Sequence, residues 1–223
     1  DTRINRSSLE QNDMIENEFW NMISLLELVL AHNKLEEPQS IHNISYFTEQ
    51  IYKEVQLNYP KLNISDEEIE NVSKLATIHD IGKLFTPYEI LNKKGKLTKD
   101  EMDIIKKHPL NGANMALKLP KCGKASKLVQ YAYNICLYHH ERYDGQGYPK
   151  GLIGDEIPLC AQVVGLADAY DALISERPYK RKINHGEAVR MIVNGECGSF
   201  SPKVILSFII ASMNKTWIEK VSK

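Results

Sequence analysis

Apolar side chains recur every three or four residues along most of the chain, which is the spacing of one face of an α-helix. Phe19, Ile23, Leu26 and Leu30 predict one long helix that ends at about His32. Alternating apolar and polar positions, the pattern of a half-buried strand, are scarce. We therefore predict an all-α fold, with a single compact helical domain over residues 39–223 and a helical lead over residues 1–38. Further helices are predicted at residues 38–58, 65–82, 98–107, 124–138, 160–175, 184–194 and 201–213, and another begins at His108.

Polar caps and helix breakers mark the ends of these helices. Capping boxes, in which a Ser or Thr and a Glu three residues later cap a helix start reciprocally, occur at Ser7–Glu10, Ser65–Glu68 and Thr98–Glu101. Pro38 starts the second helix, because proline is tolerated in a first turn. Gly82 is predicted to end the third helix, and residues 83–97 to form a loop. The lead helix either carries a signal from an upstream sensor domain or only packs on the core, and its sequence does not distinguish the two.

The composition is that of an ordinary globular protein, with 43% hydrophobic and 26% charged residues among 223. The formal net charge of −1 gives no strong field that would attract a nucleic-acid polymer or an acidic membrane. The longest apolar run, residues 23–31, contains Ser24 and Glu27 and is too short for direct membrane insertion. Four widely spaced cysteines form no CxxC pair, which favours reduced thiols and a cytoplasmic location.

Histidine and aspartate gather at the predicted helix ends. His79 and Asp80 are adjacent, His139 and His140 are adjacent, and Asp168 lies within a later helix. A lone histidine is usually a core or surface residue, so the prediction of a metal site depends on the joint pattern. Mixed nitrogen and oxygen ligands suit Fe, Mn, Zn or Ni rather than Ca or Mg alone. Two such ions roughly 3.5–4 Å apart can activate a water and bind phosphate oxygens, so the pattern predicts metal-dependent hydrolysis of a phosphodiester.

The same residues belong to a set of motifs that resembles the HD-GYP family, a subset of the HD superfamily of metal-dependent phosphohydrolases. The motifs are His79-Asp80-Ile81-Gly82-Lys83, His108-Pro109, His139 to Pro149, Asp168-Ala169-Tyr170-Asp171-Ala172-Leu173 and Arg177-Pro178-Tyr179-Lys180. The resemblance covers about residues 39–213 and includes the name-giving Gly147-Tyr148-Pro149. An isolated His-Asp pair would be weak evidence, whereas the linked motifs are specific together.

The resemblance implies a phosphodiesterase that uses two metals and a bridging hydroxide to open the bacterial second messenger cyclic di-GMP to linear pGpG, with GMP as a further product in some cases. Asp80 and Lys83 are the implied catalytic residues, and Asp80 can bridge both ions. Contacts to substrate are implied for Lys83, Asp171, Arg177 and Lys180. The implied metal ligands are His42, His79, Asp80, His108, His139, His140 and Asp168.

One position departs from the pattern. Some family members carry a Glu four residues before the first motif histidine, where it is associated with a third metal. Pro38 occupies that position here and cannot ligate through its side chain, and Glu36 and Glu37 are close but offset. We therefore expect two divalent ions, Fe or Mn before Ni, Co or Zn.

Other interpretations of single residues and of the whole chain stay open. Lys83 could be a solvated helix-end lysine, Asp171 an exposed helix-face residue, and Tyr148 a packing residue only. The alternatives to the phosphodiesterase are a catalytically silent cyclic-dinucleotide sensor or scaffold, and an HD phosphohydrolase that acts on another nucleotide such as cyclic GMP-AMP. The resemblance also implies a GGDEF-type cyclase as a partner of the Gly147–Pro149 loop. An upstream sensor domain and a homodimer are further partners that the sequence leaves open.

Overall fold

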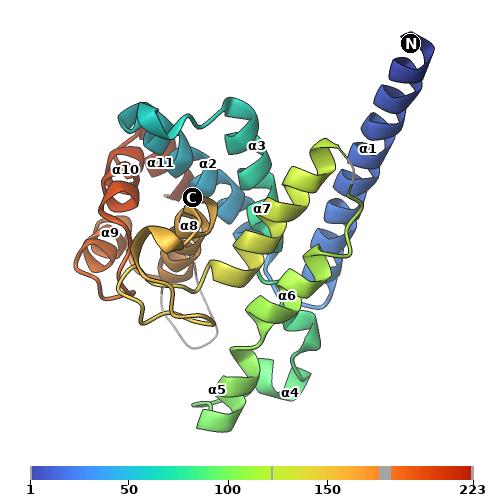
Figure 1. Cartoon of the computed structure of the whole chain (residues 1–223). Helices are drawn as coiled ribbons and strands as arrows, with labels where there is room; N and C mark the ends of the chain where they lie inside the picture. The colour runs from blue at the N-terminus through green and yellow to red at the C-terminus, as the bar shows by residue number, and fades with distance from the viewer. Residues whose placement is uncertain (1, 122, 176–181, 222–223) are drawn as a thin grey trace.

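The computed structural model describes residues 2–121, 123–175 and 182–221, and within these ranges it contains helices and turns but no strand (Figure 1). This confirms the all-α prediction. The α-helices are α1 (Thr2–His32), α2 (Pro38–Asn58), α3 (Asp66–Leu75), α4 (Tyr88–Leu91), α5 (Lys99–Ile105), α6 (His108–Ala116), α7 (Lys124–Tyr138), α8 (Leu159–Ile174), α9 (His185–Val193), α10 (Pro202–Ser212) and α11 (Lys215–Val221). The 3₁₀ turns are η1 (Pro60–Leu62), η2 (Ala76–Ile78), η3 (Ile81–Phe85) and η4 (Gly154–Glu156).

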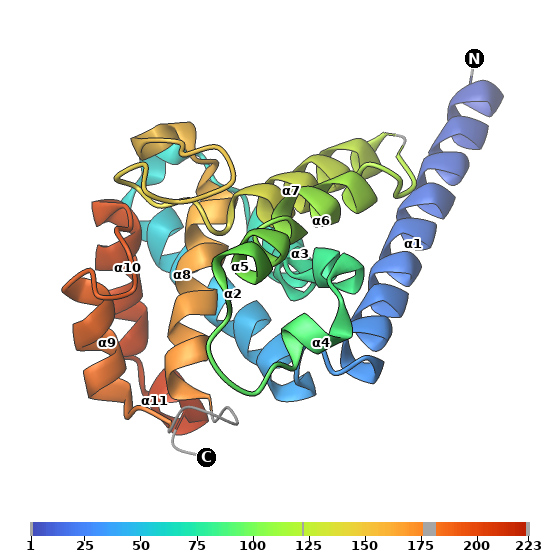
Figure 2. The same ribbon diagram turned by 90° about the horizontal axis from the view of Figure 1, so that it is seen from below.

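Helices α2 and α8 form the centre of the molecule. Both lie between the α9–α11 group and the α6–α7 pair (Figure 2). α8 is buried along most of its length, including Val163 and Tyr170, and α2 contributes Phe47 and Val55 to the same core. Burial of such side chains stabilises a fold by about 1.5–3 kcal/mol each. The core therefore fixes the orientation of α8, which also carries Asp168.

Helix α1 packs on this core through its second half and extends beyond the body of the molecule toward its N-terminus (Figure 1). Phe19, Ile23 and Leu30 are buried in the shared core. The predicted end at His32 is confirmed, but the helix begins at Thr2, so the prediction that Ser7 starts it is wrong. Neither Pro nor Gly precedes Ser7, and nothing in the sequence interrupts the helical hydrogen bonds there.

The α1–α2 connection is short and well defined. Lys34 adopts a left-handed conformation with φ 54°, and Leu35 N–H donates to Leu30 O at 3.0 Å, as in a Schellman-type helix end. Glu37 is extended and precedes Pro38, the first residue of α2, which confirms the predicted start. Residues 35–37 are therefore held between two helix ends.

Two other predicted boundaries need correction, and one helix was not predicted. α3 ends at Leu75, and Gly82 lies inside η3 instead of terminating a helix. Residues 83–97, predicted as a loop, include the end of η3 and the short α4. The final helix α11 was not predicted, because seven residues give too little periodicity, yet it buries Trp217 fully.

The predicted capping boxes at Ser65 and Thr98 have different outcomes. Thr98 and Glu101 cap each other's backbone N–H as predicted. Ser65 accepts from the N–H of Glu68, but the Glu68 carboxylate accepts from the Tyr52 hydroxyl at 2.7 Å instead of closing the box.

Within the ranges that the structure describes, no helix has both the length and the apolar character needed to cross a membrane.

Candidate metal centre

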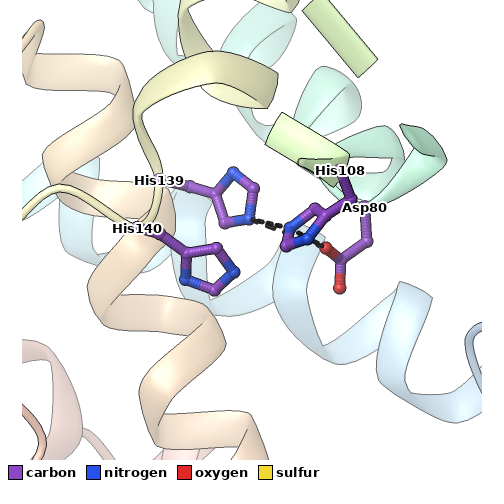
Figure 3. A group of neighbouring side chains, drawn as sticks. All are labelled: Asp80, His108, His139 and His140. Carbon is purple, nitrogen blue, oxygen red and sulfur yellow. Dashed lines mark hydrogen bonds and ion pairs between the residues drawn. The ribbon is translucent and has the colours of Figure 1, made fainter. Parts of the chain in front are cut away.

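Four side chains from three separate segments converge beside α8. Asp80 lies between η2 and η3, His108 is the first residue of α6, and His139 and His140 follow α7. One potential ligand atom from each lies within 4.8 Å of the others (Figure 3). The ring centroids of His139 and His140 are 4.1 Å apart, and those of His108 and His140 are 5.0 Å apart. Asp80, His108 and His139 are buried, so the group forms an enclosed polar cluster.

Backbone carbonyl groups fix the tautomer of the three buried histidines. Nδ1 of His79 lies 2.9 Å from Ala76 O, and Nδ1 of His108 lies 2.8 Å from Ile105 O. His139 Nδ1 has the same relation to Ile135 O at 2.9 Å. Because a carbonyl oxygen only accepts, each Nδ1 must carry a proton, and Nε2 is the ring atom whose lone pair can bind a metal. This is the usual arrangement of metal-binding imidazoles.

Two polar atoms are buried without a hydrogen-bond partner, namely Asp80 Oδ1 in the cluster and His79 Nε2 beside it. Asp80 Oδ1 lies 2.9 Å from His108 Nε2 and 3.6 Å from His139 Nε2, so one cation could be bound by all three atoms. Such unsatisfied atoms are unfavourable in a folded core unless something else binds them. A divalent cation would satisfy both atoms, so the residues present fit a metal site.

The electrostatics favour an ionised Asp80. Burial opposes its charge, but Lys83 and His79 hold the pKa of the carboxyl well below its usual range. Burial also opposes a charged His79, yet attraction to Asp80 outweighs this and raises the pKa of His79 to about 10. Without a metal, His79 therefore carries a second proton, on Nε2, at neutral pH. Cation binding must displace that proton, so the affinity for metal is expected to rise with pH.

The adjacent histidines behave in the opposite way. Burial lowers the pKa of His139, and burial together with the neighbouring His139 holds the pKa of His140 well below its usual range. Both rings are thus neutral at physiological pH. Neutral imidazoles can bind a cation without first losing a proton.

Two glycines allow the ligand-bearing segments to approach each other closely. A β-carbon at Gly82 would lie 1.9 Å from His108 O, and one at Gly165 would lie 2.3 Å from His139 O. Gly82 therefore sets the distance between η3 and the start of α6, and Gly165 sets the distance between α8 and the end of α7. Both contacts are to backbone atoms, which cannot move aside without shifting a ligand.

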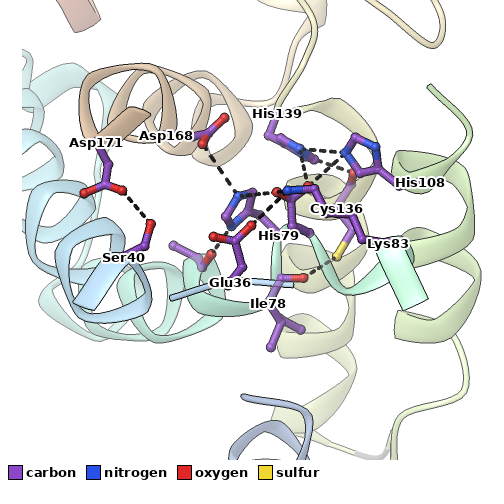
Figure 4. A network of polar contacts seen from close by, with 12 residues as sticks. Glu36, Ser40, Ile78, His79, Lys83, His108, Cys136, His139, Asp168 and Asp171 are labelled. Atoms are coloured by element: carbon purple, nitrogen blue, oxygen red, sulfur yellow. Dashed lines mark hydrogen bonds and ion pairs between the residues drawn. The ribbon is translucent and has the colours of Figure 1, made fainter. Parts of the chain in front are cut away.

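A second cluster adjoins the first and contains a residue that the sequence analysis did not assign. Ligand atoms of Glu36, His79 and Asp80 lie within 4.8 Å of one another. Figure 4 shows Glu36 beside His79. Lys83 Nζ contacts Asp80 and lies 2.9 Å from Glu36 Oε1. Burial raises the pKa of Glu36 to about 7, although Lys83 opposes the change. The sequence signal for this residue was the acidic pair before Pro38. Because both glutamates are offset from the motif position that Pro38 occupies, neither was assigned to the site.

The loop after His140 folds back on itself around a buried carboxylate. Glu141 accepts backbone N–H groups from Lys150 at 2.7 Å and Leu152 at 3.0 Å. A β-carbon at Gly147 would lie 2.3 Å from Arg142 N, so the loop can close only with glycine at that position. The glycine-rich motif therefore builds a compact loop directly against the metal cluster.

Tyr148 connects this loop to the cluster. Its ring stacks on His140, with centroids 4.7 Å apart and planes at 26°. Tyr148 N–H donates to His140 O at 3.2 Å, and the Tyr148–Pro149 peptide bond is cis. Lys106 Nζ lies 5.4 Å from the centre of the Tyr148 ring, a cation–π distance. Tyr148 thus orients one of the candidate ligands.

The remaining predicted site residues lie in different environments. Asp168 Oδ1 is 3.8 Å from His79 Nε2, beside the clusters. His42 is exposed on α2 and lies outside both clusters. Asp171 is 1% exposed and accepts hydrogen bonds from Ser40, Asn43 and Ser175, which places it in the joint between α2 and α8. Arg177 and Lys180 lie outside the described residues.

Comparison with known proteins agrees with this architecture. The HD domain family matches residues 27–204. The chain therefore belongs to the HD domain family, which confirms the family predicted from its motifs. The match begins within α1, twelve residues before the predicted domain start at residue 39.

Relatives with curated names are longer proteins. A "Probable cyclic di-GMP phosphodiesterase" of Vibrio cholerae is 44% identical over 152 residues, which are 68% of this chain and 34% of that protein. The "3'3'-cGAMP-specific phosphodiesterase 2" of the same organism is 32% identical over 142 residues, 64% of this chain and 26% of that protein. This chain thus spans about a third or less of the length of these relatives.

A solved structure shares the fold. It is described as "Bd1817, a HDG"Y"P protein from Bdellovibrio bacteriovorus". The TM-score is 0.52 at 24% identity, over 74% of this chain and 51% of the other. At this identity the similarity supports the helical architecture alone.

Proposed function

We propose that this chain is a metal-dependent phosphodiesterase domain that hydrolyses cyclic di-GMP to linear pGpG. The observation that carries the proposal is the buried cluster of Asp80, His108, His139 and His140, next to His79, with imidazole Nε2 atoms left free. The cyclic di-GMP phosphodiesterase name of the Vibrio cholerae relative supports the choice of substrate. Hydrolysis onward to GMP is part of the same proposal.

Most of the site residues would bind the metal ions, and Lys83 would stabilise the charge of the phosphate. His79, Asp80, His108, His139, His140 and Asp168 would hold two divalent ions, with Asp80 shared between them, and His42 is proposed only from the resemblance. When bound, such ions supply an activated water and neutralise phosphate charge. The carbonyl partners of His79, His108 and His139 keep each ring oriented. Lys83 stays protonated, because Asp80 and Glu36 raise its pKa despite burial, so its ammonium can stabilise the negative charge that develops on the phosphate.

The metal identity and the associations of the chain belong to the same proposal. We propose Fe or Mn as the resident ions, with Ni, Co and Zn as alternatives, because nitrogen and carboxylate ligands accept all of them. Arg177, Lys180 and Asp171 as substrate contacts stay predictions from the resemblance. The GGDEF-type cyclase partner, the upstream sensor domain, the homodimer and the cytoplasmic location likewise stay predictions.

A comparison of substrates tests the proposed reaction. Manganese-loaded protein would be incubated separately with cyclic di-GMP and with 3'3'-cyclic GMP-AMP, and products would be separated by chromatography. We expect cyclic di-GMP to be consumed at least about tenfold faster, which corresponds to about 1.4 kcal/mol of discrimination. Faster turnover of cyclic GMP-AMP would reassign the substrate, in keeping with the name of the second relative. Binding without product from either would favour the silent sensor.

A further inference from the structure

Lys83 and Glu36 form a partly buried ion pair that joins the metal centre to the α1–α2 turn. Glu36 Oε1 lies 2.9 Å from Lys83 Nζ, and the ammonium also contacts Asp80. The Glu36 side chain is 10% exposed and that of Lys83 is 23% exposed. Two carboxylates therefore share one ammonium, and only Asp80 also belongs to the cluster with His108, His139 and His140 (Figure 3).

The backbone around Glu36 holds its carboxylate in place. The left-handed Lys34 and the Leu35–Leu30 hydrogen bond end α1, and α2 begins two residues after Glu36. The next residue, Glu37, is exposed, and its side chain makes no capping hydrogen bond to α2. Of two adjacent glutamates, one is thus directed into the site and the other toward solvent.

Cations at Asp80 would change the charge balance around Lys83. A carboxylate that neutralises divalent cations can no longer offset a neighbouring ammonium, and the cations repel that ammonium. Glu36 is in contact with Lys83 independently of Asp80. It can therefore keep Lys83 in place when the charge of Asp80 is directed to the metal.

We propose that Glu36 is a positioning residue: its carboxylate holds the Lys83 ammonium at the metal centre, against the repulsion of the bound cations, where it can stabilise the phosphate. The inference rests on the proposed function, because Glu36 acts through the role given to Lys83. It also brings the connection between α1 and α2 into direct contact with the catalytic machinery.

The variant Glu36→Gln keeps the size of the side chain and removes its charge, and Glu37→Gln is the matched control at the exposed neighbour. We expect Glu36→Gln to lower kcat of the manganese-loaded protein on cyclic di-GMP about 10- to 100-fold, with KM changed less than about threefold. Lys83→Met should lower kcat about 100-fold or more. Adding Glu36→Gln to Lys83→Met should have no further effect, because the group to be positioned is already gone. Glu37→Gln should match the wild-type protein.

Elemental analysis and denaturation of the metal-free protein provide measurements apart from turnover. Glu36→Gln should bind as much manganese as the wild-type protein, and loss of a bound ion would instead make Glu36 a ligand and overturn the proposal. The shifts in denaturation midpoint for Glu36→Gln and Lys83→Met should be non-additive, as expected of a contacting pair. Additive shifts, or an equal loss of kcat with and without Lys83, would overturn it. Wild-type protein without any turnover would overturn the proposed function, whereas turnover that Glu36→Gln leaves unchanged would overturn this inference alone.

Discussion

Asp80→Asn is expected to remove metal binding and phosphodiester hydrolysis together. The amide has nearly the same shape as the carboxylate but lacks the charge that the free Nε2 atoms of His108 and His139 surround. A fall in turnover of roughly a thousandfold or more corresponds to about 4 kcal/mol of lost stabilisation. The variant should also lower the pKa of His79 from about 10, because Asp80 is the main attraction that raises it. Elemental analysis, turnover and an NMR titration of His79 measure the three effects.

The control for this variant is Asp103→Asn, on the exposed face of α5. It removes the same charge from the chain, and we expect metal content and turnover to equal those of the wild-type protein. Normal hydrolysis by Asp80→Asn would contradict the assignment of the metal centre. Loss of turnover with full metal content would show that Asp80 acts on the substrate alone.

Gly82→Ala is expected to destabilise the protein strongly and to disrupt the same centre. The added β-carbon would lie 1.9 Å from His108 O and 2.5 Å from Gly112 N, both backbone atoms. η3 and α6 must then separate, which moves Asp80 relative to His108. Overpacking of this kind typically reduces stability by about 1–3 kcal/mol, and the backbone contacts here favour the upper end. Chemical denaturation and metal content would report the two consequences.

A second glycine provides a matched control. Gly186 lies near the start of α9, and the nearest atom to its β-carbon would be Asn184 Oδ1 at 3.8 Å. Gly186→Ala should leave stability unchanged or raise it by up to about 1 kcal/mol, because alanine favours a helix over glycine. If Gly82→Ala were as stable as Gly186→Ala, the close approach of η3 and α6 would not constrain the site.

Local patterns were sufficient to predict most of the helices. Apolar spacing predicted α7 over residues 124–138, and proline positions predicted the starts of α2 at Pro38 and of α6 at His108. These signals lie within one element, so no knowledge of distant contacts is needed. Gly82 shows the limit of such local patterns. A glycine that ends a helix and a glycine that allows close backbone contact cannot be distinguished in the sequence. Only the approach of His108, 26 positions away, distinguishes them.

The sequence predicted the part of the candidate site whose residues are adjacent in the chain. His79, Asp80, His139 and His140 stand in adjacent pairs at helix ends, and the structure brings them together with His108. Glu36 reaches Lys83 across 47 positions only because the α1–α2 turn folds back to the site. Sequence spacing does not reveal such a contact.

The partners of Asp171 also depend on tertiary packing. Hydrogen bonds from Ser40 and Asn43 on α2 and from Ser175 surround its carboxylate, and burial raises its pKa although these bonds oppose the change. A helix-face pattern on α8 alone could not show that α2 would cover this position.

The most direct test of the central claim is a metal titration with two measurements on each sample. Protein stripped of metal would be titrated anaerobically with Mn²⁺ or Fe²⁺, and bound metal per chain and cyclic di-GMP turnover would be measured together. We predict no turnover without metal, and activity that rises until about two ions are bound per chain, as a two-metal phosphodiesterase requires. Full turnover by the stripped protein, or a filled site that leaves cyclic di-GMP intact, would contradict the account.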